Sequence, residues 1–253
     1  MKQIINWTPE SDPFTKKGEI QVHAIIHDIM SKDSHSKFKS KQNRINILKR
    51  AEKTIGENIS GNVLDVGCGN GYASIFLAQN RPIDVVHSME CNLPAIDSLV
   101  RNHFKQAEVD DEKYELILGS FNDIKMKKFY NYVISLGALH HSSNLLKTTS
   151  EIYSSLQCGG YLIAHEPYMS SFTPNDKYIK KDNTSKKVQG LVDWRESNRD
   201  DHFFRKCEWL TAFHHSGFNI VCFEEESRDD DIFNAIIVLQ KPHEELVYIP
   251  HVW

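Results

Sequence analysis

The sequence predicts an α/β fold built on a mainly parallel sheet, and three observations support this. Short β-rich runs alternate with helical segments from residue 62 onward, as in parallel strands joined by crossover helices. A glycine-rich turn follows the first run, at the kind of position where such folds bind ligands. The last two runs, 219–227 and 233–241, are joined only by "RDDDI", so they are expected to be antiparallel neighbours.

The region before the sheet is expected to be helical. Residues 1–18 contain Pro9, Pro13 and Gly18 and are predicted to be irregular. Apolar spacing in 19–30 and 40–55 predicts two amphipathic helices joined by the polar hinge "SKDSHSKFKS".

The core follows in a regular order. A helix ended by Gly217 is expected over 207–218, before the terminal pair of strands. Residues from about 168 to 205 are polar and too long for an ordinary connection, which favours a functional insertion. Five strands are predicted before that insertion, at 62–67, 84–90, 114–119, 130–139 and 161–167.

Composition indicates an ordinary soluble protein. The 253 residues include 40% hydrophobic and 25% charged residues, near the globular average. The net charge of −4 gives no general attraction to nucleic acid, so a nucleic-acid partner is not favoured. Five cysteines without a C-x-x-C pair favour a reducing cytoplasm. We expect no membrane span or secretory signal, because no long apolar run occurs.

The turn "NVLDVGCGNGYAS" at 62–74 restricts the ligand. A triphosphate loop needs a lysine that is absent here, and a dinucleotide turn needs a third glycine where Tyr72 stands. Glu90, at the end of the next strand, suits the paired hydroxyls of a ribose. Asp65, just before the turn, would repel a pyrophosphate, so a cationic or zwitterionic ligand fits better.

Three segments, "LDVGCGNG", "ALHH" and "GGYLIAHEP", occur in this order. Through them the chain resembles the class I S-adenosylmethionine-dependent methyltransferases, specifically small stand-alone bacterial ones, over roughly residues 60–240. The resemblance implies a Rossmann-like, seven-stranded, mostly parallel sheet with an antiparallel last strand and helices on both faces. It also implies an N-terminal helical lid, so we expect residues 1–58 to form that lid and 59–253 the core.

The resemblance also implies S-adenosylmethionine as cofactor, with S-adenosylhomocysteine as product. It places the glycine turn against the methionine part, Glu90 on the ribose and Leu136 beside the sulfonium. Ser120 stands where the family usually has an aspartate for the adenine amino group, and its hydroxyl can still accept a hydrogen bond. The predicted cofactor residues are Asp65, Gly67, Cys68, Gly69, Glu90, Cys91, Ser120, Phe121, Leu136 and Gly137.

Three catalytic candidates follow from the rule that ligands lie outside the carboxyl ends of strands. His140, His141 and Glu166 come from the fourth and fifth of these ends. A histidine can take the proton of an acceptor hydroxyl, whereas Glu166 needs a raised pKa or an orienting role. Either histidine can instead be structural. No third ligand has metal-site spacing, so no metal is predicted.

The polar insertion is the expected place for acceptor recognition. Its lysines and arginines exceed its acidic residues and suit phosphate or carboxylate, although solvated surface charge is the alternative interpretation. The predicted acceptor-binding residues are Tyr168, Trp194, Arg195, Arg199, His202 and Arg205.

We therefore expect O-methylation of a small polar, sugar- or phosphate-containing acceptor, such as a surface-polysaccharide precursor. The alternatives are a non-catalytic cofactor-binding partner subunit and an N-methyltransferase of a small molecule or nucleic acid. The oligomeric state is left open.

Overall fold

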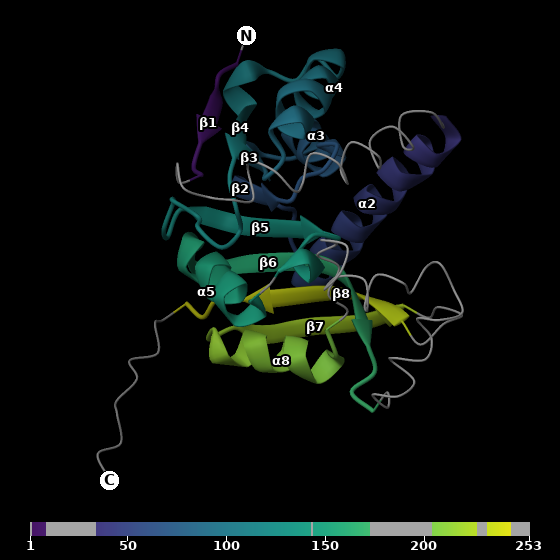
Figure 1. Ribbon diagram of the computed structural model, residues 1–253, viewed down its shortest axis with the longest axis vertical. Coiled ribbons are helices and arrows are strands. Elements are labelled where there is room, and N and C mark those ends of the chain that lie inside the picture. Colours follow the sequence, from purple (N-terminus) through teal and green to yellow (C-terminus); the bar gives the residue numbers. More distant parts are fainter. Residues whose placement is uncertain (1, 9–33, 143, 173–203, 227–231, 244–253) are drawn as a thin grey trace, which may run out of the picture.

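The computed structural model describes residues 2–8, 34–142, 144–172, 204–226 and 232–243. Its centre is one eight-stranded sheet with helices on both faces (Figure 1). The strands are β1 (Ile4–Asn6), β2 (Gly61–Val66), β3 (Ile83–Glu90), β4 (Tyr114–Leu118), β5 (Tyr130–Leu136), β6 (Leu156–Met169), β7 (Asn219–Glu226) and β8 (Ile232–Gln240). The helices and helical turns are α2 (Ser34–Ile55), α3 (Tyr72–Asn80), η2 (Ala95–Val100), α4 (Arg101–Gln106), η3 (Asp111–Lys113), η4 (Leu139–His141), α5 (Leu145–Ser155) and α8 (Lys206–His215).

The strand order is β1-β4-β3-β2-β5-β6-β8-β7. The strands from β1 to β6 in this order pair in parallel, and β8 is antiparallel to both β6 and β7. The predicted α/β fold and its antiparallel terminal pair are confirmed. The order places β8 between β6 and β7, so the last strand of the chain is not at the edge.

The sheet has eight strands rather than the seven implied by the resemblance. The additional strand is β1, which lies in a stretch predicted to be irregular and pairs in parallel with β4, Ile4 opposite Leu116. Lys2 forms an ion pair with Glu115 at 3.0 Å beside it. Three residues are too few to show a strand period, so only the partner strand defines β1.

The second predicted helix is longer than expected. α2 begins at Ser34, six positions before the predicted start, because the polar hinge contains no proline or glycine to stop a helix. The helix predicted over 19–30 lies outside the described residues. None of the helices in the described ranges is both long and apolar enough to cross a bilayer.

Two apolar layers hold the sheet between the helices. On one face α2, α3 and α4 cover the sheet, and Leu48 and Phe104 are fully buried there. On the other face α5 and α8 do so, with Trp209 and Phe213 fully buried (Figure 1). Each large side chain removed from water contributes roughly 1.5–3 kcal/mol. These layers fix the strand ends that carry the polar side chains.

The fourth predicted strand ends earlier than its apolar run suggests. β5 stops at Leu136 because Gly137 turns the chain at φ 81°, and the next residues form the 3₁₀ turn η4. The following strand, β6, starts at Leu156 and continues to Met169, longer at both ends than the predicted 161–167. The carboxyl ends of β2, β3, β5 and β6 meet at one edge of the sheet.

Candidate functional site

A glycine turn joins β2 to α3 at that edge. Gly67, Gly69 and Gly71 have φ values of 64°, 58° and 75°, a left-handed conformation that side chains with a Cβ rarely adopt. A Cβ placed on Gly67 would lie 2.4 Å from the Cβ of Ala138, just after β5. The turn is therefore packed against the segment that carries Gly137 and the two predicted histidines.

Glu90 ties this turn to the end of β3. Its Oε2 accepts from the Gly69 amide at 3.1 Å, and its Oε1 accepts from the Cys91 amide at 2.9 Å. The next strand is also connected, because the Gly119 amide donates to the Glu90 carbonyl at 3.0 Å. The structure thus brings the turn, Glu90 and the end of β4 together.

Asp65 lies beneath the turn and is almost fully buried. Its Oδ2 accepts from the Ser74 hydroxyl at 2.6 Å. Burial raises the pKa of Asp65 to about 6, against the opposing effects of the Ser74 hydrogen bond and the Arg44 guanidinium. A carboxyl with this pKa ionises more readily when a cation lies beside it.

Arg44, on α2, is a candidate site residue that the sequence did not predict. Its Nη2 lies 4.0 Å from the position of a Cβ on Gly69, the nearest atom to that open space. Among the described residues, Arg44 has no carboxylate at ion-pair distance. The sequence spacing does indicate its position. Ile47, Leu48 and Ala51 lie three, four and seven positions after Arg44 and are buried, so Arg44 lies on the apolar face of the helix.

The predicted adenine segment follows β4. The Ser120 hydroxyl accepts from the Asn122 amide at 3.2 Å, and the Ser120 carbonyl accepts from the Asp123 amide at 3.0 Å. Phe121 is partly buried and packs against the apolar layer of α5 and α8. Trp7, after β1, donates its amide to the Leu118 carbonyl at 2.8 Å and so lies next to this segment.

Glu166 is fully buried and organises the segment after β5. Its Oε1 accepts from the Ser135 hydroxyl at 3.0 Å and from the amides of Ala138 and Leu139 at 3.0 and 2.9 Å. Its Oε2 accepts from His140 Nδ1 at 2.8 Å. Burial alone would raise the pKa of Glu166, but the His140 and backbone hydrogen bonds lower it overall. An ionised carboxylate suits this set of donors.

The two predicted histidines lie side by side. The ring centroids of His140 and His141 are 4.1 Å apart, with an interplanar angle of 38°. The His141 amide donates to the Ala138 carbonyl at 3.1 Å, within the η4 turn. Within the described ranges, no cluster of three or more His, Cys, Asp or Glu side chains is arranged to hold a metal.

Predicted acceptor-binding residues are only partly placed by the structure. Tyr168 is 3% exposed and packs against the rings of Phe233 and Phe223 at 5.5 and 5.4 Å, which argues against contact with an acceptor. Arg205 is the N-cap residue of α8, bridged to Met169. The other four predicted acceptor-binding residues, Trp194, Arg195, Arg199 and His202, lie outside the described residues.

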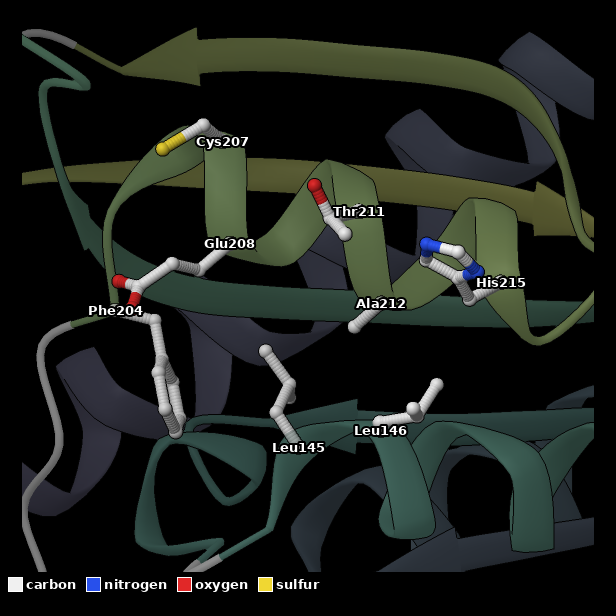
Figure 2. A pocket seen from close by; sticks show the side chains of 8 residues that line it. All are labelled: Leu145, Leu146, Phe204, Cys207, Glu208, Thr211, Ala212 and His215. Atoms are coloured by element: carbon white, nitrogen blue, oxygen red, sulfur yellow. The ribbon is translucent and has the colours of Figure 1, made fainter.

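A cavity of about 330 Å³ lies between α5 and α8, on the face of the sheet opposite α2 (Figure 2). Its walls are mostly apolar and include Leu145, Leu146, Phe204 and Ala212, together with the polar side chains of Glu208 and His215. It contains none of the predicted cofactor or catalytic residues. It is a gap between two helices and not the site formed at the strand ends.

The known proteins that this chain resembles in sequence are methyltransferases. A family model described as a methyltransferase domain matches residues 37–222. The ribosomal RNA small subunit methyltransferase C of Buchnera aphidicola is 29% identical over 154 residues, which are 55% of this chain and 44% of that protein. The tRNA U34 carboxymethyltransferase of Campylobacter fetus is 27% identical over 171 residues, 58% of each protein. This chain thus spans about half the length of these relatives.

The fold is shared with solved structures. Geranyl diphosphate C-methyltransferase from Streptomyces coelicolor, crystallised with S-adenosyl-L-homocysteine, superposes with a TM-score of 0.61 at 12% identity. The superposition covers 76% of this chain and 75% of that one. At this identity the likeness establishes the architecture of the sheet and its helices.

Proposed function

The chain belongs to the methyltransferase-domain family, and we propose that it transfers a methyl group from S-adenosylmethionine to an oxygen of a phosphate-bearing acceptor. The observation that carries this proposal is the pair formed by His140 and the buried Glu166 at the carboxyl ends of β5 and β6. This pair lies beside Gly137, and Ala138 in the same segment packs against the glycine turn.

The charges at the turn fit S-adenosylmethionine, which combines a sulfonium, an ammonium, a carboxylate and a ribose. A Cβ on Gly137 would have no heavy atom within 4 Å, so this edge leaves space beside the turn. Asp65 suits the cationic groups, Glu90 the ribose hydroxyls and Arg44 the carboxylate. We propose these three residues as the principal polar contacts, with Ser120 and Phe121 beside the adenine.

His140 is the proposed general base. Since Glu166 accepts from Nδ1, we assign the tautomer in which Nδ1 carries the proton and Nε2 is basic. When bound, S-adenosylmethionine would supply the methyl carbon on its sulfonium: the acceptor oxygen would form a bond to that carbon while the carbon–sulfur bond breaks, and the sulfur would leave as the thioether of S-adenosylhomocysteine. His140 Nε2 takes the hydroxyl proton, and Glu166 stabilises the imidazolium that forms. In this scheme Glu166 is a positioning residue.

Two kinds of acceptor share the proposed chemistry. The first is a small sugar- or phosphate-containing molecule, such as a polysaccharide precursor, supported by the basic residues of the insertion. The second is RNA, supported by the names of the two relatives above. Both present hydroxyl oxygens near phosphate groups.

The test is release of S-adenosylhomocysteine by the full chain with nucleotide-linked sugars, sugar phosphates, small amines and total tRNA. A non-catalytic subunit would bind the cofactor in calorimetry but release no product with any of these acceptors. Turnover with amines alone would contradict the oxygen acceptor and favour N-methylation.

Two substitutions test the base. His140→Asn retains a donor that can reach Glu166 but removes Nε2, so we expect turnover to fall about 10²–10⁴-fold at unchanged cofactor affinity. His141→Asn, on the neighbouring ring, is the matched control and is expected to lose far less. Equal turnover of the two variants would remove His140 from the proposed role.

A further inference from the structure

One face of α2 carries positive charge that the cofactor site does not use. Lys41, Lys49 and Lys53 are exposed on this helix. The only acidic residue of α2 is Glu52, which is buried and whose Oε2 accepts from Arg81 Nη2 at 2.7 Å. The exposed face therefore has lysines without an acidic residue of its own helix to balance them.

The lysines are arranged along a line and do not converge on one point. From Lys41 to Lys53 the helix rises about 18 Å, at 1.5 Å per residue. Exposed Gln42 and Asn46 lie on the same helix and are hydrogen-bonded to each other at 3.0 Å. A single small phosphate needs side chains that surround it, whereas an extended row on a convex helix suits a polyanion. Each nucleic-acid strand carries one charge per about 3.4 Å of helix axis.

The same helix leads to the methyl-donor site. Arg44 lies between Lys41 and the other two lysines in sequence and reaches the glycine turn from the inner face of α2. The first turns of α2 extend away from the sheet (Figure 1). The Lys41 end of the row is near Arg44 in sequence, so a polyanion held along α2 would extend toward the edge that contains the turn.

We propose that the exposed face of α2 docks RNA through contacts between its lysines and the phosphate backbone. This inference rests on the proposed function, because it selects RNA as the phosphate-bearing acceptor of the same site. Backbone contacts of this kind position a nucleic acid and do not read its sequence. The positive charge is local, since the whole chain has a net charge of −4.

The experiment compares two double variants of the full chain. Lys49→Glu with Lys53→Glu reverses charge on α2, and Lys105→Glu with Lys147→Glu makes the same change at exposed lysines elsewhere. Binding of a labelled 20-nucleotide RNA and of total tRNA is followed by fluorescence anisotropy at several salt concentrations. Unfolding temperatures of both variants establish that each is folded.

We expect the α2 variant to bind RNA at least 10-fold more weakly than wild type and the control variant less than 3-fold more weakly. The slope of log affinity against log salt should fall by about 1.4 in the α2 variant, for two lost phosphate contacts. Equal weakening in both variants would overturn the inference. So would a preference of wild type for vesicles of phosphatidylcholine and phosphatidylglycerol over RNA, which would identify an anionic membrane as the partner.

The docking inference and the proposed function fail in different ways. If wild type binds S-adenosylmethionine and methylates a small acceptor without binding RNA, only the docking inference is lost. If it binds RNA with the expected α2 dependence but does not bind S-adenosylmethionine, the proposed function is lost.

Discussion

The charged residues around the glycine turn differ in sign and in their partners. Asp65 and Glu90 place two carboxylates at the glycine turn, and Arg44 adds one cation near Gly69. A zwitterionic ligand balances both signs, which neither a purely anionic nor a purely cationic ligand does. Glu166 is separate from this group, because its oxygens already accept from the η4 segment and His140.

Arg44 offers the sharpest test at this scale. Arg44→Ala should weaken S-adenosylmethionine binding about 10- to 100-fold, since a hydrogen bond to a charged group contributes roughly 1.5–3 kcal/mol. Arg44→Lys should recover part of the loss, and Lys49→Ala on the same helix is the control. Calorimetric titration gives the affinities. An unaltered affinity in Arg44→Ala would show that this guanidinium does not contact the cofactor.

At the scale of elements, the glycine turn and the segment after β5 act as one packed unit. Gly67 combines a left-handed φ of 64° with a close approach to Ala138. Gly56, after α2, has a φ of 88° but no heavy atom within 4 Å of its Cβ position. Both glycines have a left-handed backbone, but only Gly67 has a close neighbour, so comparing them distinguishes the cost of backbone strain from the cost of steric contact.

Gly67→Ala should therefore destabilise the protein more than Gly56→Ala. The left-handed conformation costs a residue with a Cβ about 1–2 kcal/mol, which both variants incur. Only Gly67→Ala adds a Cβ–Cβ contact of 2.4 Å, which must displace Ala138 and with it the η4 turn. Urea denaturation measures both free energies of unfolding. Equal losses would mean that the turn relaxes without cost.

For the whole molecule, two buried groups give the free energy of unfolding opposite pH dependences. The folded pKa of Asp65 is about 6 against an ordinary 3.8, so stability falls as pH rises from about 4 to 6. Burial, with a smaller effect of Lys2, lowers the pKa of His87 from 6.5 to about 4. The stability contributed by neutral His87 is complete above pH 6.5 and is lost as pH falls to 4.

Asp65→Asn should expose the pH dependence that His87 gives to the free energy of unfolding. In wild type the two slopes largely cancel between pH 4 and 6, whereas the variant should lose on the order of 3 kcal/mol as pH falls from 6.5 to 4. It should also be more stable than wild type at pH 8 without cofactor. Asp84→Asn, at an exposed position of β3, is the control. If the free energy of unfolding changed with pH in the same way in wild type and Asp65→Asn, the predicted contribution of Asp65 would be contradicted.

Local patterns in the sequence were sufficient for most of the fold and for the position of the glycine turn. Hydrophobic periodicity depends only on residues one to four positions apart. It was therefore enough to predict the parallel strands from β2 to β6, most of α2 and the terminal antiparallel pair. The glycine turn could be predicted because glycine, which has no Cβ, adopts a left-handed backbone conformation without strain. The two acidic residues beside it follow from their positions at strand ends.

Only the tertiary structure decided the features that join distant segments. β1 exists because β4 offers it an edge, and Tyr168 is a core residue because Phe223 and Phe233 pack on it. The His140–Glu166 pair spans 26 positions, and Arg44 reaches a glycine 25 positions away. The sequence by itself determined seven of the eight strands of the sheet and the ligand class of its glycine turn. The folded chain determined which charges meet at the turn, because contacts between residues far apart in the chain leave no periodic pattern in the sequence.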